Sequence, residues 1–150
     1  MIRIDDLERK NFRAGEFIGS LKALELGIDN RPKEQATLKN LMLTASMMQR
    51  VREALEKPIT ITSGFRSKEV NDAVGGSKTS KHLLGLACDF ICPSFGNPEK
   101  IVRYLKEIDF NCDVCLIETT WVHIHTKENV DDNRKMFGFW DIKNKKFEAI

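Results

Sequence analysis

Apolar side chains recur at helical spacing in two segments of the chain. Between residues 32 and 57 they return every three or four positions, and Pro32 suits the first turn of a helix. The same spacing appears over 98–108, and 11–32 is typical of a helix-rich segment that ends in a turn. We therefore predict a long helix over 32–57 and a shorter one over 98–108. Core packing accounts for the Met and Leu stripe of the long helix.

Short runs of β-branched and apolar residues follow these helical segments. They predict strands at 58–62, 86–92, 114–118 and 121–125 and a terminal hairpin at 137–147. Ser67 is placed to cap a short helix that continues through Ala73. Helices and short strands in this order predict an α+β fold in which a small antiparallel sheet is flanked by helices.

The size and charge of the chain exclude several classes of protein. Its 150 residues suit one domain, 1–150. The 24 Lys and Arg residues against 22 Asp and Glu leave a net charge of +2, without the excess of positive charge that is typical of proteins that bind nucleic acid. No apolar run is long enough for membrane insertion, and the charged start over 1–10 lacks the apolar stretch of a signal peptide. We therefore expect a protein that is cytoplasmic as synthesised, with its four cysteines reduced.

All three histidines fall in two places that a sheet can bring together. His82 stands at the mouth of a glycine-containing turn, and Asp89 lies in the strand expected after it. His123 and His125 alternate along one strand and so point to the same face. Two imidazoles and a carboxylate are the ligand count of a catalytic zinc site, which keeps one position open for water. On spacing alone, histidines that simply make polar contacts stay an alternative.

Glu118 and Arg66 are candidate reactive groups near these histidines. If residues 119–120 form a two-residue turn, the Glu118 side chain shares a face with His123. A carboxylate there can take a proton from water and pass it to a leaving group. Arg66 follows one predicted strand and precedes a helix, where its guanidinium can hold a carboxylate or an oxyanion. An exposed turn glutamate and a surface salt bridge are the alternative interpretations.

The order of these residues resembles the zinc D-Ala-D-Ala carboxypeptidase family. These are peptidoglycan peptidases that include phage endolysins, and their fold is shared with the hedgehog signalling domain. The resemblance is carried by Ser63-Gly64-Phe65-Arg66-Ser67, Asn71, Gly75-Gly76, Ser80-x-His82-x-x-Gly85-x-Ala87-x-Asp89 and Trp121-Val122-His123. It covers about residues 12–126, is strongest to short single-domain bacterial and phage members, and leaves 127–150 as a C-terminal appendage.

This resemblance implies a hedgehog/DD-peptidase-like fold and one zinc ion. The ligands would be His82, Asp89 and a histidine of the last motif. Short members of the family carry Ser where this chain has His125, which favours His123 as the third ligand. The hedgehog-type pattern has its own His-x-His and favours the opposite choice. His125 would otherwise face the substrate or support a ligand.

The resemblance also implies an activity, namely zinc-dependent hydrolysis of a peptide bond in peptidoglycan stem peptides. Glu118 would be the general base, Arg66 would bind the substrate carboxylate or the polarised carbonyl, and Ser80 would position the substrate or the loop. Carboxypeptidase and endopeptidase action both stay open. The expected partner is the stem peptide, and we expect a monomer.

Other interpretations of the same residues stay open. A non-catalytic zinc module of the same fold would use the ligands to hold a binding surface, and a structural or phage tail-associated protein would bind no stoichiometric metal. Cys88-x-x-x-Cys92 and Cys112-x-x-Cys115 could suggest a four-cysteine zinc site, although buried small hydrophobic residues are the better account. The peptidase would have to reach the cell wall after release or as part of a phage particle.

Overall fold

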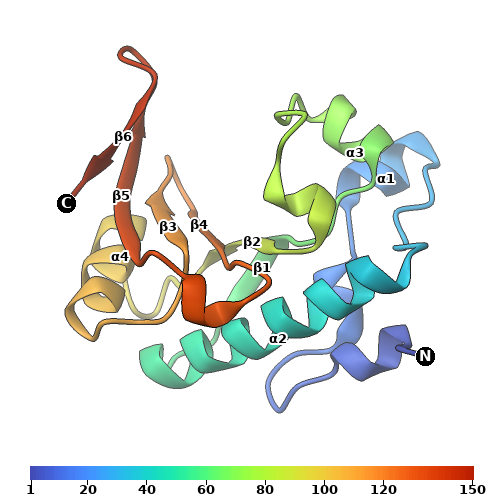
Figure 1. Ribbon diagram of the computed structural model, residues 1–150, viewed down its shortest axis with the longest axis horizontal. Coiled ribbons are helices and arrows are strands. Elements are labelled where there is room, and N and C mark those ends of the chain that lie inside the picture. The colour runs from blue at the N-terminus through green and yellow to red at the C-terminus, as the bar shows by residue number, and fades with distance from the viewer.

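A six-stranded sheet in the order β1-β2-β4-β3-β5-β6 organises the protein, and the computed structural model describes all 150 residues (Figure 1). Its strands are β1 (Thr60–Ser63), β2 (Ala87–Ile91), β3 (Val114–Ile117), β4 (Val122–His125), β5 (Met136–Asp141) and β6 (Lys146–Ala149). The helices are α1 (Leu21–Leu26), α2 (Gln35–Leu55), α3 (Lys68–Ala73) and α4 (Pro98–Glu107). Single 3₁₀ turns are η1 (Ile4–Leu7), η2 (Ala14–Phe17), η3 (Lys81–Leu84) and η4 (Val130–Asp132). The predicted α+β class is confirmed.

One pair of neighbouring strands, β3 and β5, is parallel, whereas an antiparallel sheet was expected. β4 ends at His125 and β5 begins at Met136, and both residues lie beside Val114 of β3. The connecting segment 126–135 therefore only crosses the end of β3, and the strand that it leads into must run in the direction of β3. A backbone hydrogen bond of 3.0 Å from Met136 to the carbonyl of Asp113 holds the crossing.

The helix α2 begins three residues later and ends two residues earlier than the pattern predicted. Before it, the Asp29 carboxylate accepts hydrogen bonds from the backbone of Arg31 and from the side chain of Lys33, so this segment is a turn. After it, Glu56 takes a left-handed conformation with φ of 55°, and Pro58 disfavours a helical residue before it. The predicted cap of α3 is present, since Ser67 accepts from the backbone of Val70.

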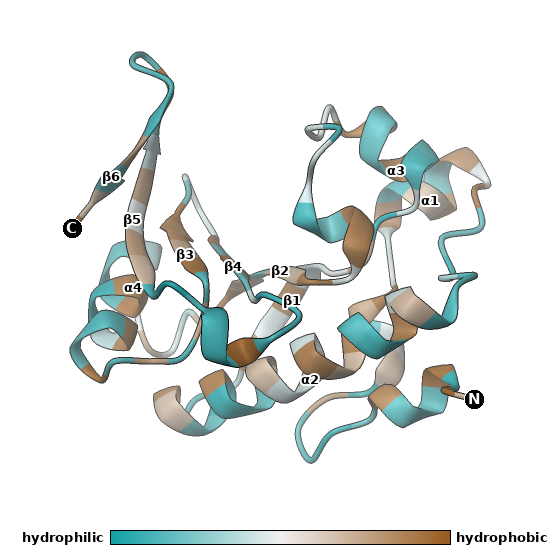
Figure 2. Cartoon of the chain, viewed as in Figure 1, coloured by the Kyte–Doolittle hydropathy of each residue, from teal (hydrophilic) through white to brown (hydrophobic).

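The two faces of the sheet have different partners. α2 runs below the sheet in Figure 1, and apolar side chains from α2, α4 and the lower face form one core. The core residues from the strands include Cys88, Phe90, Val122, Ile124, Cys115 and Phe137. β3 is apolar along its length, whereas the tip of the β5–β6 hairpin is hydrophilic (Figure 2). None of the helices combines the length and the apolarity that crossing a lipid bilayer requires.

Alternate residues of the same strands point to the opposite face, which α2 does not cover. A single row on that face runs Asp89–His123–Leu116–Gly138 across β2, β4, β3 and β5. In Figure 1 the β5–β6 hairpin extends above the sheet at one end, and α3 with the loop into η3 extends above it at the other. The row that contains Asp89 and His123 therefore lies between two raised segments.

Candidate metal centre

His82, Asp89 and His123 converge on one point above the open face of the sheet. Asp89 in β2 and His123 in β4 are direct cross-strand partners, and His82 comes from η3, just before β2. One candidate ligand atom from each residue lies within 4.8 Å of the other two, and the chain holds no other such group of histidine, cysteine, aspartate or glutamate. His82 and Asp89 are only 3% and 6% exposed. The structure thus brings together the three side chains that the sequence predicts as ligands.

Hydrogen bonds determine which nitrogen of His82 carries the proton. Nδ1 lies 2.7 Å from the carbonyl oxygen of Gly64, and because this oxygen can only accept, Nδ1 is the donor. When the ring carries only this proton, its Nε2 lone pair faces Oδ1 of Asp89 at 3.2 Å. Two lone pairs that face each other repel unless a proton or a cation lies between them. This buried contact therefore fits a pair of cation ligands.

The same reasoning applies to His123. Its Nδ1 lies 2.9 Å from Oδ1 of Asp89, and its Nε2 lies 2.9 Å from Nδ1 of His125. Nε2 of His125 is 3.4 Å from a carboxylate oxygen of Asp113, which can only accept. In the tautomer of His125 that carries its proton on Nε2, toward this carboxylate, Nδ1 accepts from Nε2 of His123. In that arrangement Nδ1 of His123 is unprotonated toward Asp89.

The donor set and its spacing suit zinc. Imidazole nitrogens and carboxylate oxygens lie about 2.0–2.2 Å from zinc, which places tetrahedral ligand atoms roughly 3.3 Å apart. The two imidazole nitrogens are 3.2 Å and 2.9 Å from Oδ1 of Asp89, close to that spacing. Burial alone would raise the pKa of Asp89, but a proton or a cation between its carboxylate and the rings of His82 and His123 opposes burial and holds the pKa well below its usual range. The carboxylate is therefore charged and available as a ligand.

Asp113 and Arg134 anchor the far end of this network. Asp113 is 1% exposed, and it accepts from the backbone N, Nε and Nη2 of Arg134 at 3.0, 2.9 and 2.8 Å. Burial raises the pKa of Asp113, but these hydrogen bonds outweigh it and lower the pKa to about 2. Burial and the neighbouring His123 lower the pKa of His125 to about 3. Near neutral pH His125 is thus an uncharged ring beside a charged carboxylate.

Arg66 lies on the other side of Asp89. Its Nη2 is 3.5 Å from Oδ2 of Asp89, its Nε donates to Ser63 Oγ at 3.1 Å, and its Nη1 lies 3.4 Å from Oδ1 of Asn71. A guanidinium has five N–H donors, so these three contacts leave two donors free. Arg66 also lines the cavity described next, so those donors can reach a bound group.

The candidate ligands open into a cavity of about 700 Å³. Glu118, Ser80 and His125 also line it. The predicted two-residue turn is confirmed, since the backbone N of Glu118 donates to the carbonyl of Trp121 at 3.0 Å and Leu116 pairs with His123. Burial raises the pKa of Glu118, with Asp89 adding to the effect and His123 opposing it. Ser80 caps η3 by accepting from the backbone N of His82 at 3.2 Å.

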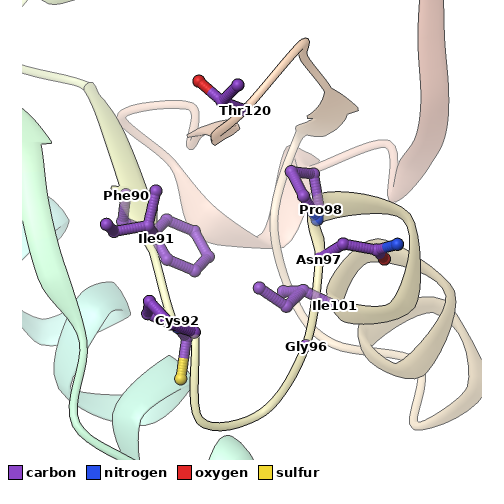
Figure 3. A pocket seen from close by; sticks show the side chains of 9 residues that line it. Phe90, Ile91, Cys92, Gly96, Asn97, Pro98, Ile101 and Thr120 are labelled. Carbon is purple, nitrogen blue, oxygen red and sulfur yellow. The ribbon is translucent and has the colours of Figure 1, made fainter.

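A smaller cavity of about 360 Å³ lies between the end of β2 and the start of α4 (Figure 3). Its lining includes Phe90, Cys92 and Pro98 but no histidine, carboxylate or basic side chain. Burial raises the pKa of the Cys92 thiol, so the thiol stays protonated. All four cysteines are free and buried, and none joins a group that could hold a metal. We therefore place the chemistry in the larger cavity, and the four-cysteine interpretation is not supported.

Three residues near the centre were not among the predicted site residues. They are Asp113, Arg134 and Trp140, and Trp140 lines the same cavity as the candidate ligands. Asp113 carries a charge in the otherwise apolar run 112–117, and a buried charge requires a partner, so this signal was present in the sequence. Arg134 and Trp140 lie in the loop and hairpin after β4, and no sequence pattern connects them with the histidines.

Comparison with known families places these residues in a known context. The family described as Peptidase M15 matches residues 10–125. The chain belongs to the Peptidase M15 family. The matched region contains His82, Asp89, His123, Glu118 and Arg66. The predicted family is thereby confirmed.

This M15 chain is similar to a curated protein, the zinc D-Ala-D-Ala carboxypeptidase of Streptomyces albus G, with 41% identity over 58 residues. The match covers 38% of this chain and 23% of that protein. The chain therefore matches only about a quarter of the length of its relative. Membership of the family indicates a peptidase, and the relative's name specifies zinc for that protein.

Proposed function

We propose that this M15 peptidase hydrolyses a peptide bond in peptidoglycan stem peptides, with one zinc ion held by His82, Asp89 and His123. The observation that carries the proposal is the pair of imidazole nitrogens that face a single carboxylate oxygen at the base of an open cavity. A cation satisfies this arrangement, and the family and its relative support zinc as that cation. The substrate class follows from the relative's name, which specifies D-Ala-D-Ala.

The chemistry divides between the metal and the residues around it. A zinc ion at this position would lower the pKa of a bound water to about 7 and polarise the substrate carbonyl. Glu118 takes the proton of the attacking water and returns it to the departing amine. The raised pKa of Glu118 suits this role, because a carboxyl that titrates nearer to neutral pH is a better proton donor in the second step.

Arg66 and the second histidine position the reacting groups. The two free donors of Arg66 bind the terminal carboxylate of the substrate or the oxygen on which negative charge develops. His125, fixed by Asp113, accepts the Nε2 proton of His123 and so keeps Nδ1 of His123 free to coordinate. Ser80 holds the turn that carries His82.

Digestion of defined substrates tests this function. Zinc-loaded protein is incubated with purified peptidoglycan and with a synthetic stem pentapeptide that ends in D-Ala-D-Ala, and the products are identified by mass. Release of the terminal D-Ala indicates a carboxypeptidase, an internal cut indicates an endopeptidase, and a chelator should stop either reaction. If the protein binds one equivalent of zinc and cuts neither substrate, the non-catalytic zinc module is the better description.

A Glu118→Gln variant separates catalysis from metal binding. Loss of a general base lowers the rate by about 10²–10⁴-fold, whereas the amide leaves the three zinc ligands untouched. Zinc affinity, measured by competition with a chelating dye, should therefore stay at the wild-type value. A Gln variant that is as active as the wild type would remove Glu118 from the mechanism.

A further inference from the structure

The cavity around the metal centre is polar at one end and apolar at the other. The loop of residues 75–80 supplies glycine, serine and threonine at the end near Arg66. The apolar side chains of the lining are Leu116, Trp121 and Trp140, and all of them come from the strands and turn on the other side of His123. A peptide whose carboxylate lies at Arg66 therefore extends its N-terminal part toward the apolar end.

Trp140 reaches this cavity because of its register in β5. Gly138 lies beside Leu116, which lies beside His123, and Trp140 is two residues further along the same face. Phe147 of β6 is the cross-strand partner of Trp140, and its ring fills the space beside Gly138 that a side chain there would take. As cross-strand partners, Trp140 and Phe147 lie on the same face of the hairpin, and Trp140 is 51% exposed.

The hairpin that carries Trp140 lies outside the segment shared with the M15 family, which ends at residue 125. It is joined to the family's part of the sheet by the pairing of β5 with β3. In Figure 1 it rises at the opposite end of the open face from α3. The cavity therefore has one wall from the region that matches the family and one wall from the hairpin that follows it.

We propose that Trp140 is a specificity-determining residue, the wall of a subsite for an aliphatic side chain in the N-terminal part of an extended peptide substrate. The inference rests on the proposed function and deepens it. A partly exposed aromatic ring with few rotatable bonds offers a large apolar surface at little cost in conformational entropy. Together with Trp121 and Leu116 it makes an apolar corner that continues directly from the metal centre.

The strand spacing places this subsite along the substrate. Neighbouring strands lie about 4.8 Å apart and residues in a strand rise about 3.4 Å, so the Cα atoms of Trp140 and His123 are roughly 12 Å apart. An extended peptide covers about 3.3 Å per residue, so Trp140 lies about three to four residues along the peptide from the metal centre. Short peptides cannot reach it.

Three synthetic peptides with the same scissile bond test this length dependence. One ends next to the bond, and two are extended on the N-terminal side, with Leu or with Gly at the third position. Their kcat/KM values are measured with zinc-loaded wild type, Trp140→Ala and Trp140→Phe. The control is Phe139→Ala, since Phe139 is also partly exposed, at 42%, but points to the other face of the same strand. Binding without turnover is measured by calorimetry on zinc-loaded Glu118→Gln with and without Trp140→Ala.

We expect Trp140→Ala to lower kcat/KM and affinity for the Leu peptide about tenfold, with the Gly and short peptides unaffected. Trp140→Phe should keep most of the preference, and Phe139→Ala should keep all of it. Equal losses on all three peptides, or no loss on the Leu peptide, would overturn the inference. If the peptides are cleaved but kcat/KM does not change in Trp140→Ala, only the proposed subsite is overturned. A Trp140-dependent affinity for the Leu peptide without any cleavage overturns the proposed function alone.

Discussion

Replacement of Asp113 by Asn removes one buried charge and keeps the shape of the side chain. In the folded protein three hydrogen bonds from Arg134 lower the pKa of Asp113 from 3.8 to about 2, although burial opposes the change. A tenfold change in proton affinity is worth about 1.4 kcal/mol, so the charged carboxylate contributes roughly 2.5 kcal/mol. Because the Arg134 side chain is 52% exposed, solvent screening reduces this figure, and we expect Asp113→Asn to lose about 2 kcal/mol at pH 7.

The sign of the pH dependence follows from the lowered pKa. A group whose pKa falls on folding stabilises the protein above its unfolded pKa, and this contribution is lost as the pH drops from about 4 toward 2. Urea unfolding of metal-free wild type and Asp113→Asn, followed by circular dichroism at pH 7, 5, 4 and 3, measures the difference between them. It should shrink to about half by pH 3. A difference that stays constant over this range, or is below about 0.5 kcal/mol at pH 7, would refute the reasoning.

Four further substitutions probe the centre and its support. His123→Ala should abolish stoichiometric zinc binding, whereas His125→Ala should weaken zinc affinity by about 10–100-fold, as measured by chelator competition. If both variants lost zinc to the same extent, His125 would be a ligand as well. Arg66→Lys should lower kcat/KM at least about tenfold on the pentapeptide, because an ammonium lacks the planar fork that holds several acceptors at once; an unchanged value would remove Arg66 from substrate binding. Gly64→Ala should cost about 1–3 kcal/mol, read as a lower Tm, because its Cβ would overlap the backbone carbonyl of Phe17; an unchanged Tm would mean that the backbone shifts freely.

Most of the fold follows from hydrophobic periodicity. The helix predicted over 98–108 is α4, and the strands predicted at 86–92, 114–118 and 121–125 are β2, β3 and β4 with ends that differ by one residue. Alternation specifies which residues share a face of a strand, but it does not specify which strands are neighbours. The parallel pairing of β5 with β3 was therefore missed, because it depends on where the loop after β4 crosses the sheet.

The same limit applies to the site. His123 and His125 share a strand face by alternation, and a single turn brings His82 and Asp89 together, so the sequence predicted these local relations. The ion pair of Arg134 with Asp113 and the approach of Trp140 depend on the position of β5. No periodicity within one segment contains that information, since it arises from pairing between segments.

The register also bears on the choice between the two histidines as third ligand. His123 lies directly opposite Asp89, whereas His125 lies opposite Ala87, one pair further along β4. For His125 to replace His123, its Nδ1 would have to leave Nε2 of His123 and reach past that ring to Asp89. Its Nε2 would also have to leave Asp113, a charged carboxylate that Arg134 holds in place. The strand pairing and the buried charge therefore act in the same direction, and both favour His123 as the ligand with His125 as its support.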